Sequence, residues 1–161
     1  MLKYTNTQVT FREIPDEITL CINISGCPIR CPDCHSKELW EDIGTELSFD
    51  ELKRLIEQNN GITCVCFMGG DSDKWYIREL TQYINNLYPN LKVAWYSGSD
   101  ESSPVMLSSL DYYKYGSYKK QFGGLDQKTT NQRLFYINRD KEIADDITYK
   151  FWKNEDEKEH T

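Results

Sequence analysis

Three short runs of β-branched and apolar residues, each followed by a glycine, limit most strongly what this chain can fold into. The runs are residues 17–25, 62–68 and 91–97. Continuous apolar runs of this length are typical of strands that are buried on both faces, as in a parallel sheet. Parallel strands need crossover connections, which are usually helices. The pattern therefore predicts an α/β fold, provided that helical segments lie between the runs.

Two segments between these runs have the pattern of amphipathic helices. Ser48 and Glu51 form a capping box before a helix that ends at the turn 59–61. Residues 75–87 repeat apolar side chains at helical spacing, and Pro89 follows shortly after. Strands that alternate with helices predict a mostly parallel sheet with crossover helices.

Further elements are expected on both sides of this core. Residues 8–14 have the pattern of an edge strand that Pro15 ends, 105–110 that of a short helical piece, and 111–115 and 133–137 that of later strands. A complete eight-stranded (β/α) barrel takes about 250 residues. With 161 residues, the chain is long enough only for a partial, open barrel.

Length and composition indicate one domain in a reducing compartment. We expect a single domain over residues 1–161, with its core at about 17–137 and a flexible acidic tail at about 153–161. Six cysteines without a visible targeting segment favour metal or redox chemistry over disulfides. No stretch reaches the length of a membrane span, so a cytoplasmic location is expected.

The charge is distributed unevenly along the chain. A formal net charge of −7 disfavours binding to nucleic acid. Between Asp111 and Arg139, however, six basic residues stand against two acidic ones, which makes this stretch locally +4. Two interpretations stay open for it: a solvated rim, or a docking surface for an anionic partner.

Cys27, Cys31 and Cys34 carry the most specific chemical signal, because Cys-x3-Cys-x2-Cys brings three thiols into one short loop. Three thiolates can bind three irons of a four-iron, four-sulfur cluster. Without a fourth protein ligand, one iron stays open for a substrate. His35, next to the last cysteine, is either a packing residue or a contact to cofactor or substrate.

Two other interpretations of these cysteines stay open. Cys21 would complete a four-cysteine structural zinc site, although it lies in the middle of a predicted strand and structural zinc usually takes two separated pairs. Inert, buried cysteines are the second alternative. Cys21, Cys64 and Cys66 themselves lie within apolar strands, where a free cysteine acts as a small hydrophobic residue, so we expect them in the core.

Two more loops directly follow predicted strands. Gly69, Gly70 and Asp71 follow one strand, and Ser97 and Gly98 close the next. Carboxyl ends of parallel strands share one edge of a sheet, which is where ligands bind in α/β folds. Glycines let backbone carbonyls approach an ammonium group, and the aspartate either adds negative charge or fixes the loop. We expect both loops beside the cysteine loop.

Taken together, these residues resemble the radical S-adenosylmethionine superfamily, whose cluster motif is Cys-x3-Cys-x2-Cys. Within it, the chain is most similar to the activating proteins of anaerobic ribonucleoside-triphosphate reductases, which are short members that activate glycyl radical enzymes. The similar stretches follow in order over about residues 17–137: 25–36 with Leu39 and Trp40, 67–71, 95–98, and 116–118 followed by 131–134. The last stretch, Gly-x-Tyr and then Asn-Gln-Arg, is typical of this subgroup.

The resemblance implies a partial, open (β/α) barrel of the radical SAM type. It implies that Cys27, Cys31 and Cys34 bind a [4Fe-4S] cluster whose open iron is chelated by S-adenosylmethionine. Reductive cleavage would give methionine and a 5′-deoxyadenosyl radical, which removes a hydrogen atom from a glycine of the reductase. The implied protein partners are that reductase and an electron donor such as flavodoxin or ferredoxin.

The resemblance also assigns the other site residues. It implies that the methionine end is held by Gly69, Gly70 and Asp71, that the adenosyl part lies near Asp33 and His35 beside Cys34, and that a hydrogen bond comes from Ser97. Gln132, Arg133 and the basic stretch are candidates for docking or for loop structure.

Three residues depart from the family pattern. Asp33 stands where an aromatic residue is common, which excludes ring stacking on adenine from that position. Ser72 stands in place of a proline, and Ser97 in place of a threonine, with the hydroxyl preserved. Two other functions stay open: activation of another glycyl radical protein or modification of a peptide, and a non-catalytic iron-sulfur or zinc module that only binds a partner.

Overall fold

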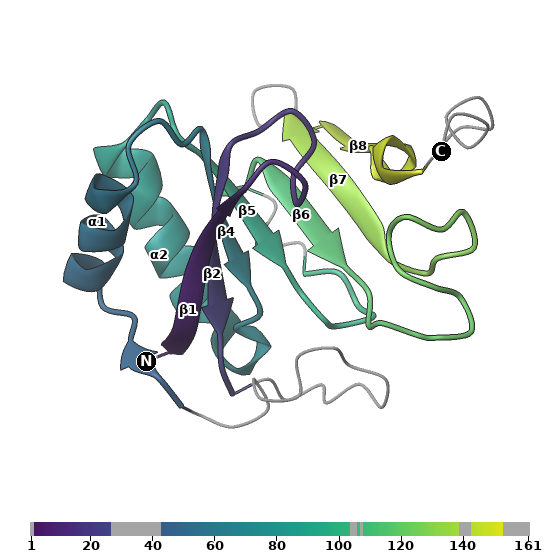
Figure 1. The fold of residues 1–161 in the computed structure, drawn as a ribbon, viewed down its shortest axis with the longest axis horizontal. Helices are drawn as coiled ribbons and strands as arrows, with labels where there is room; N and C mark the ends of the chain where they lie inside the picture. The colour runs from purple at the N-terminus through teal and green to yellow at the C-terminus, as the bar shows by residue number, and fades with distance from the viewer. Residues whose placement is uncertain (1, 27–42, 104–105, 107, 139–142, 153–161) are drawn as a thin grey trace.

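A computed structural model describes residues 2–26, 43–103, 106, 108–138 and 143–152. In this part, eight strands form one sheet in the order β3-β1-β2-β4-β5-β6-β7-β8 (Figure 1). The elements are β1 Lys3–Thr10, β2 Thr19–Ile24, β3 Thr45–Glu46, α1 Phe49–Gln58, β4 Cys64–Met68, η2 Asp71–Asp73, α2 Lys74–Leu87, β5 Lys92–Tyr96, β6 Tyr112–Tyr115, β7 Arg133–Asn138, β8 Ile143–Asp146 and η4 Thr148–Phe151.

The sheet is mixed, with its parallel part at the centre. β2, β4, β5 and β6 are parallel neighbours. β1 and β3 on one side, and β7 and β8 on the other, pair antiparallel. The four central strands therefore end at one common edge, where β2 leads into the cysteine loop. The order runs from β3 to β8 without closing on itself.

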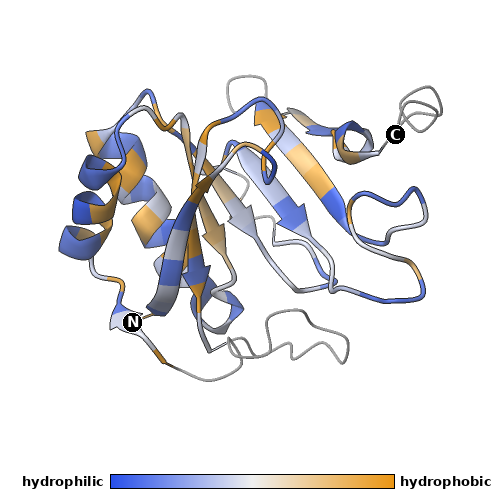
Figure 2. Ribbon diagram, in the orientation of Figure 1, coloured by the Kyte–Doolittle hydropathy of each residue, from blue (hydrophilic) through white to orange (hydrophobic). Residues whose placement is uncertain are grey.

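Helices α1 and α2 cover one face of this sheet, which we call the helical face (Figure 1). Ser48 caps α1 by accepting a hydrogen bond from the Glu51 N–H at 3.1 Å, which confirms the predicted helix start. Figure 2 shows that α1 turns its apolar side to the sheet and its polar side outward. Buried residues on this face include Leu52, Leu55, Ile56, Ile77, Leu80 and Ile84 from the helices, and Ile22, Val65, Phe67, Val93 and Trp95 from the strands.

The opposite face carries three buried cysteines, and we call it the thiol face. Its core consists of Cys21, Cys64, Cys66, Ala94, Tyr96, Tyr112 and Leu134 from the sheet, with Ile14 and Ile147 packed on them. Strand register places Cys21, Cys66, Ala94 and Tyr112 in one row across the sheet. The cover comes from the β1–β2 loop and from η4, which contribute Ile14 and Phe151.

Several predicted boundaries are wrong at the edges of the sheet. The edge strand expected at 8–14 lies at Lys3–Thr10, which lacks a regular alternation of apolar and polar residues. β3 and β8 were not predicted, because two or four residues without an apolar pattern are too short to recognise. The helical piece expected at 105–110 lies partly outside the described residues.

No helix in the described part of the chain is both long and apolar enough to span a bilayer.

Candidate functional site

Three parallel strand ends meet beside the start of the cysteine loop. The Gly69 N–H donates to the Tyr96 carbonyl at 2.9 Å, which joins the end of β4 to the end of β5. The Trp95 indole N–H donates to the Gly69 carbonyl at 2.7 Å from the helical face. We call Gly69, Gly70, Asp71, Ser97 and Gly98 the strand-end cluster; the structure brings together all the site residues predicted after β4 and β5.

Both glycines of this cluster have backbone conformations that side chains rarely adopt. Gly69 has φ +101° and Gly70 has φ +91°. A Cβ on Gly69 would lie 3.1 Å from the carbonyl oxygen of Ile24, and one on Gly70 would lie 2.7 Å from Cδ1 of Ile77. The chain thus needs glycine twice at this point to pass between the end of β2 and helix α2.

Gly70→Ala is expected to lower stability more than Gly61→Ala. Both positions have positive φ, +91° and +88°, but nothing lies within 4 Å of a Cβ on Gly61. The shared strain costs about 1–2 kcal/mol, and overpacking against Ile77 adds about 1–3 kcal/mol at Gly70. Urea denaturation of both variants measures the difference. Equal losses would show that Ile77 moves aside without cost.

Asp71 links the two loops through both of its carboxylate oxygens. Oδ1 accepts the hydrogen bond of the Ser97 hydroxyl, and Oδ2 accepts the Gly98 N–H at 3.1 Å. Ser97 is 1% exposed, and its hydroxyl oxygen also accepts the Ser99 N–H at 3.1 Å. The sequence allowed two roles for Asp71, which are to add negative charge or to fix the loop. These hydrogen bonds support the second role.

A fourth strand end is held in a similar way. The Gln132 side-chain amide donates to the Gly116 carbonyl at 3.2 Å, and that of Asn131 donates to the Ser117 carbonyl at 3.0 Å. Gln132 is 7% exposed, so its contacts are those of loop structure. Arg133 lies 3.6 Å from a carboxylate oxygen of Asp146.

The predicted cluster ligands Cys27, Cys31 and Cys34, with Asp33 and His35, lie outside the described residues. Residues on either side of this segment are described, however. The Ser25 hydroxyl lies 2.5 Å from the carbonyl oxygen of Ile43 and 3.2 Å from the carbonyl oxygen of Lys3. The Ser25 N–H also donates to the Lys3 carbonyl, at 3.0 Å.

The segment 27–42 therefore begins and ends at anchored backbone. Ser25 is 2% exposed. The sequence marked it as the last residue of a strand and as the first of the stretch 25–36 that resembles the family, but its partner Ile43 carries no pattern that would predict the contact.

Cys21, Cys64 and Cys66 lie in the core, as predicted, with 1%, 0% and 0% of their surface exposed. Burial raises the pKa of the Cys64 and Cys66 thiols well above that of a free cysteine. Among the described residues, no group of three or more histidine, cysteine, aspartate or glutamate side chains is placed to hold a metal ion. These three thiols act as packing residues.

The buried thiol of Cys64 makes stability fall at alkaline pH. Its folded pKa lies above its unfolded pKa of about 8.5, so its contribution is complete below the unfolded value and is lost as pH rises above it. We expect the free energy of unfolding to decrease from about pH 8.5 upward, and to decrease less in Cys64→Ala. Denaturation series at pH 7 and above test this; parallel curves for both proteins would contradict it.

In the sequence the three cysteines follow β2, whose carboxyl end shares one edge of the sheet with the strand-end cluster. Residues 18–121 match the family described as a 4Fe-4S single cluster domain. The match covers more than half of the chain and includes the three cysteines and the strand-end cluster, so the chain belongs to this family. Searches of curated proteins and of solved structures found no match.

The residues present fit a [4Fe-4S] cluster. Cys27, Cys31 and Cys34 supply thiols, the ligand that iron-sulfur clusters take. The other three cysteines are buried in the core of the thiol face. No cysteine in the described part of the chain is therefore left to join the trio as a fourth ligand.

Proposed function

We propose that the chain is a radical S-adenosylmethionine enzyme that generates a glycyl radical on an anaerobic ribonucleoside-triphosphate reductase. The observation that carries the proposal is the strand-end cluster. It lies against the end of β2, and the first cysteine follows that end only a few residues later in the chain. Because its glycines have no side chains, backbone carbonyls in this cluster can approach an ammonium group closely. Family membership and the resemblance of 116–118 and 131–134 add further support.

In this proposal Cys27, Cys31 and Cys34 hold the cluster. When bound, the cluster supplies an electron that cleaves S-adenosylmethionine to methionine and a 5′-deoxyadenosyl radical. The Gly69 and Gly70 carbonyls are already hydrogen bonded once, to Trp95 Nε1 and to the Asp73 N–H. Each has a second lone pair with which to accept an ammonium hydrogen of the methionine end.

Asp71 contributes by holding these carbonyls in place. Its carboxylate joins the loop after β4 to Ser97 and Gly98, so the two loops move as one unit. Asp33 and His35 are assigned to the adenosyl part. A preformed backbone site of this kind spends little free energy on ordering when the ligand binds.

The open sheet favours a macromolecular substrate. β3 and β8 lie at opposite ends of the strand order, which is compatible with the partial, open barrel of this proposal. A protein can reach the carboxyl edge of the central strands from the side, whereas an enzyme for small molecules normally encloses its substrate. Flavodoxin or ferredoxin would supply the electron.

Anaerobic reconstitution with iron and sulfide, followed by chemical reduction, tests the proposal. We expect conversion of S-adenosylmethionine to 5′-deoxyadenosine, and a glycyl radical signal in electron paramagnetic resonance when the reductase is added. Failure of the iron-loaded protein to form 5′-deoxyadenosine would overturn the enzyme proposal. Cleavage without radical transfer to the reductase would redirect it to another glycyl radical protein or a peptide.

A further inference from the structure

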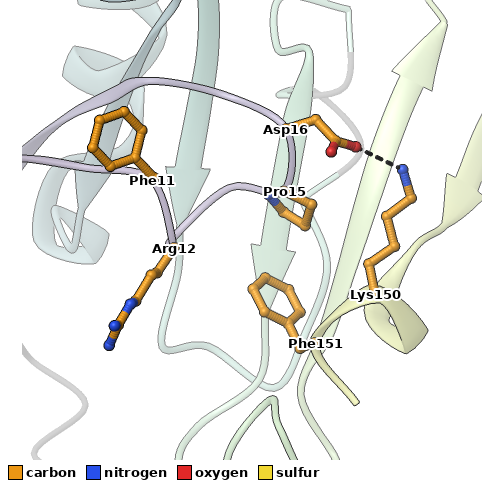
Figure 3. Close-up of a pocket in the computed structure, with 6 residues that line it drawn as sticks. All are labelled: Phe11, Arg12, Pro15, Asp16, Lys150 and Phe151. Atoms are coloured by element: carbon orange, nitrogen blue, oxygen red, sulfur yellow. Dashed lines mark hydrogen bonds and ion pairs between the residues drawn. The ribbon is translucent and has the colours of Figure 1, made fainter. Parts of the chain in front are cut away.

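The β1–β2 loop and η4 form a surface cleft on the thiol face. Figure 3 shows the six residues that line it: Phe11, Arg12, Pro15, Asp16, Lys150 and Phe151. The cleft has a volume of about 580 Å³, which is in the range of sites that hold a few side chains of a ligand. None of its residues belongs to the strand-end cluster.

Two of the six residues that line the cleft are aromatic, and one of them, Phe11, is strongly exposed. Phe11 is 71% exposed, the largest value among the large hydrophobic residues that the structure describes. Phe151 also lines the cleft, and it packs with one side on the core of the thiol face. An exposed aromatic ring beside a cation is typical of residues that dominate binding between proteins.

The lining of the cleft carries a net positive charge. Lys150 pairs with Asp16 at 3.2 Å, so these two charges largely compensate each other. Arg12 is exposed and forms no ion pair with another described residue. Its backbone is fixed, because its N–H donates to the Thr10 hydroxyl at 3.1 Å. In a chain with a net charge of −7, this cleft selects for a negatively charged group.

The cleft is linked to the proposed site through the end of β5. Tyr96, the last residue of β5, donates its hydroxyl hydrogen to the Glu13 carbonyl. This contact holds the β1–β2 loop, including Phe11 and Arg12, against the thiol face. Because Ser97 directly follows Tyr96, one continuous stretch of chain connects the loop contact with the strand-end cluster.

We infer that this cleft binds an extended segment of the protein substrate that carries a carboxylate next to an aromatic or aliphatic side chain. The inference rests on the proposed function. The carboxylate pairs with Arg12, and the apolar side chain packs between Phe11 and Phe151. Engagement of this segment brings a neighbouring part of the substrate to the carboxyl edge of the central strands.

Charge reversal and truncation in the cleft test the inference. Arg12→Glu and Phe11→Ser are each expected to weaken binding of the reductase by about tenfold or more, and to lower the glycyl radical yield at limiting reductase. Cleavage of S-adenosylmethionine without reductase should stay at the wild-type rate. Matched controls on the helical side are Lys53→Glu and Leu87→Ser, whose residues are also exposed and which should change neither quantity.

The outcomes separate the two proposals. A wild-type protein that cleaves no S-adenosylmethionine overturns the proposed function, whatever the cleft variants do. Wild-type cleavage together with unchanged reductase affinity in Arg12→Glu overturns the cleft alone. Binding that weakens with salt in the wild type, but much less in Arg12→Glu, supports the ion pair. Competition by millimolar benzoate alone, with no effect of either variant on the reductase, would show a small-carboxylate site and contradict the inference.

Discussion

Replacing Cys27, Cys31 or Cys34 by alanine is expected to abolish both cluster binding and cleavage of S-adenosylmethionine. Each variant leaves two thiols for a cluster that, in the proposed function, has only three protein ligands. Two thiolates from one short loop do not retain four irons against dilution. Iron and sulfide content per chain after anaerobic reconstitution, the visible absorption of the cluster and the yield of 5′-deoxyadenosine measure the effect.

The chain contains its own matched controls for this experiment. Cys21→Ala, Cys64→Ala and Cys66→Ala remove thiols that are buried in the sheet. They should keep the iron content and the cleavage activity, and lose about 1–3 kcal/mol of stability because each removes buried volume. Full loss of iron in Cys21→Ala would mean that the site is closed by four cysteines, and the proposed open iron would be wrong.

Asp71→Asn is expected to lower the efficiency of S-adenosylmethionine cleavage by about 10- to 100-fold while the cluster is retained, which corresponds to about 1.5–3 kcal/mol for a hydrogen bond to a charged group. The asparagine oxygen still accepts from Ser97. Its NH₂ group, however, faces the Gly98 N–H, and two donors cannot bond to each other. The loop after β4 then keeps its hydrogen bond to Ser97 but loses the one to Gly98 in the loop after β5. Steady-state cleavage at several S-adenosylmethionine concentrations measures the loss.

Asp100→Asn is the matched control for this change. Asp100 accepts hydrogen bonds from the Ser117 N–H at 2.8 Å and its hydroxyl at 2.9 Å, and the backbone contact is the main reason why its pKa is lowered. It stabilises the loop after β6 instead of the strand-end cluster, so cleavage should stay close to wild type. Ser97→Ala should reproduce part of the Asp71 effect, with less than additive loss in the double variant. Full cleavage activity of Asp71→Asn would show that the proposed site does not depend on the carboxylate of Asp71.

The local features of the fold could be predicted from the sequence, whereas the contacts between distant segments could not. The capping box at Ser48 and the apolar runs of β4 and β5 depend only on residues close to one another in the chain, so their patterns can be recognised in the sequence. Grouping Asp71 with Ser97 required only that β4 and β5 be parallel. Strands were expected at 8–14 and 133–137, but the true extent of β1 and the antiparallel pairing of the flanks escaped prediction, because that pairing depends on partners far along the chain.

The same limit applies to the candidate site. The positions of glycines after strands indicated where the backbone turns, but not that Gly70 passes beside Ile77. Nothing in the sequence links Glu13 to Tyr96, so the cover of the thiol face and the cleft at Phe11 became visible only in three dimensions.

The contact between Ser25 and Ile43 bears on how much free energy a bound cluster must supply to order its segment. Closing a flexible segment costs conformational entropy, and in many small metal sites the metal itself supplies that free energy. Here the sheet and one hydroxyl group already hold the two ends of segment 27–42 together. A cluster held by Cys27, Cys31 and Cys34 would therefore have less closure entropy to offset than one in a segment whose ends are free.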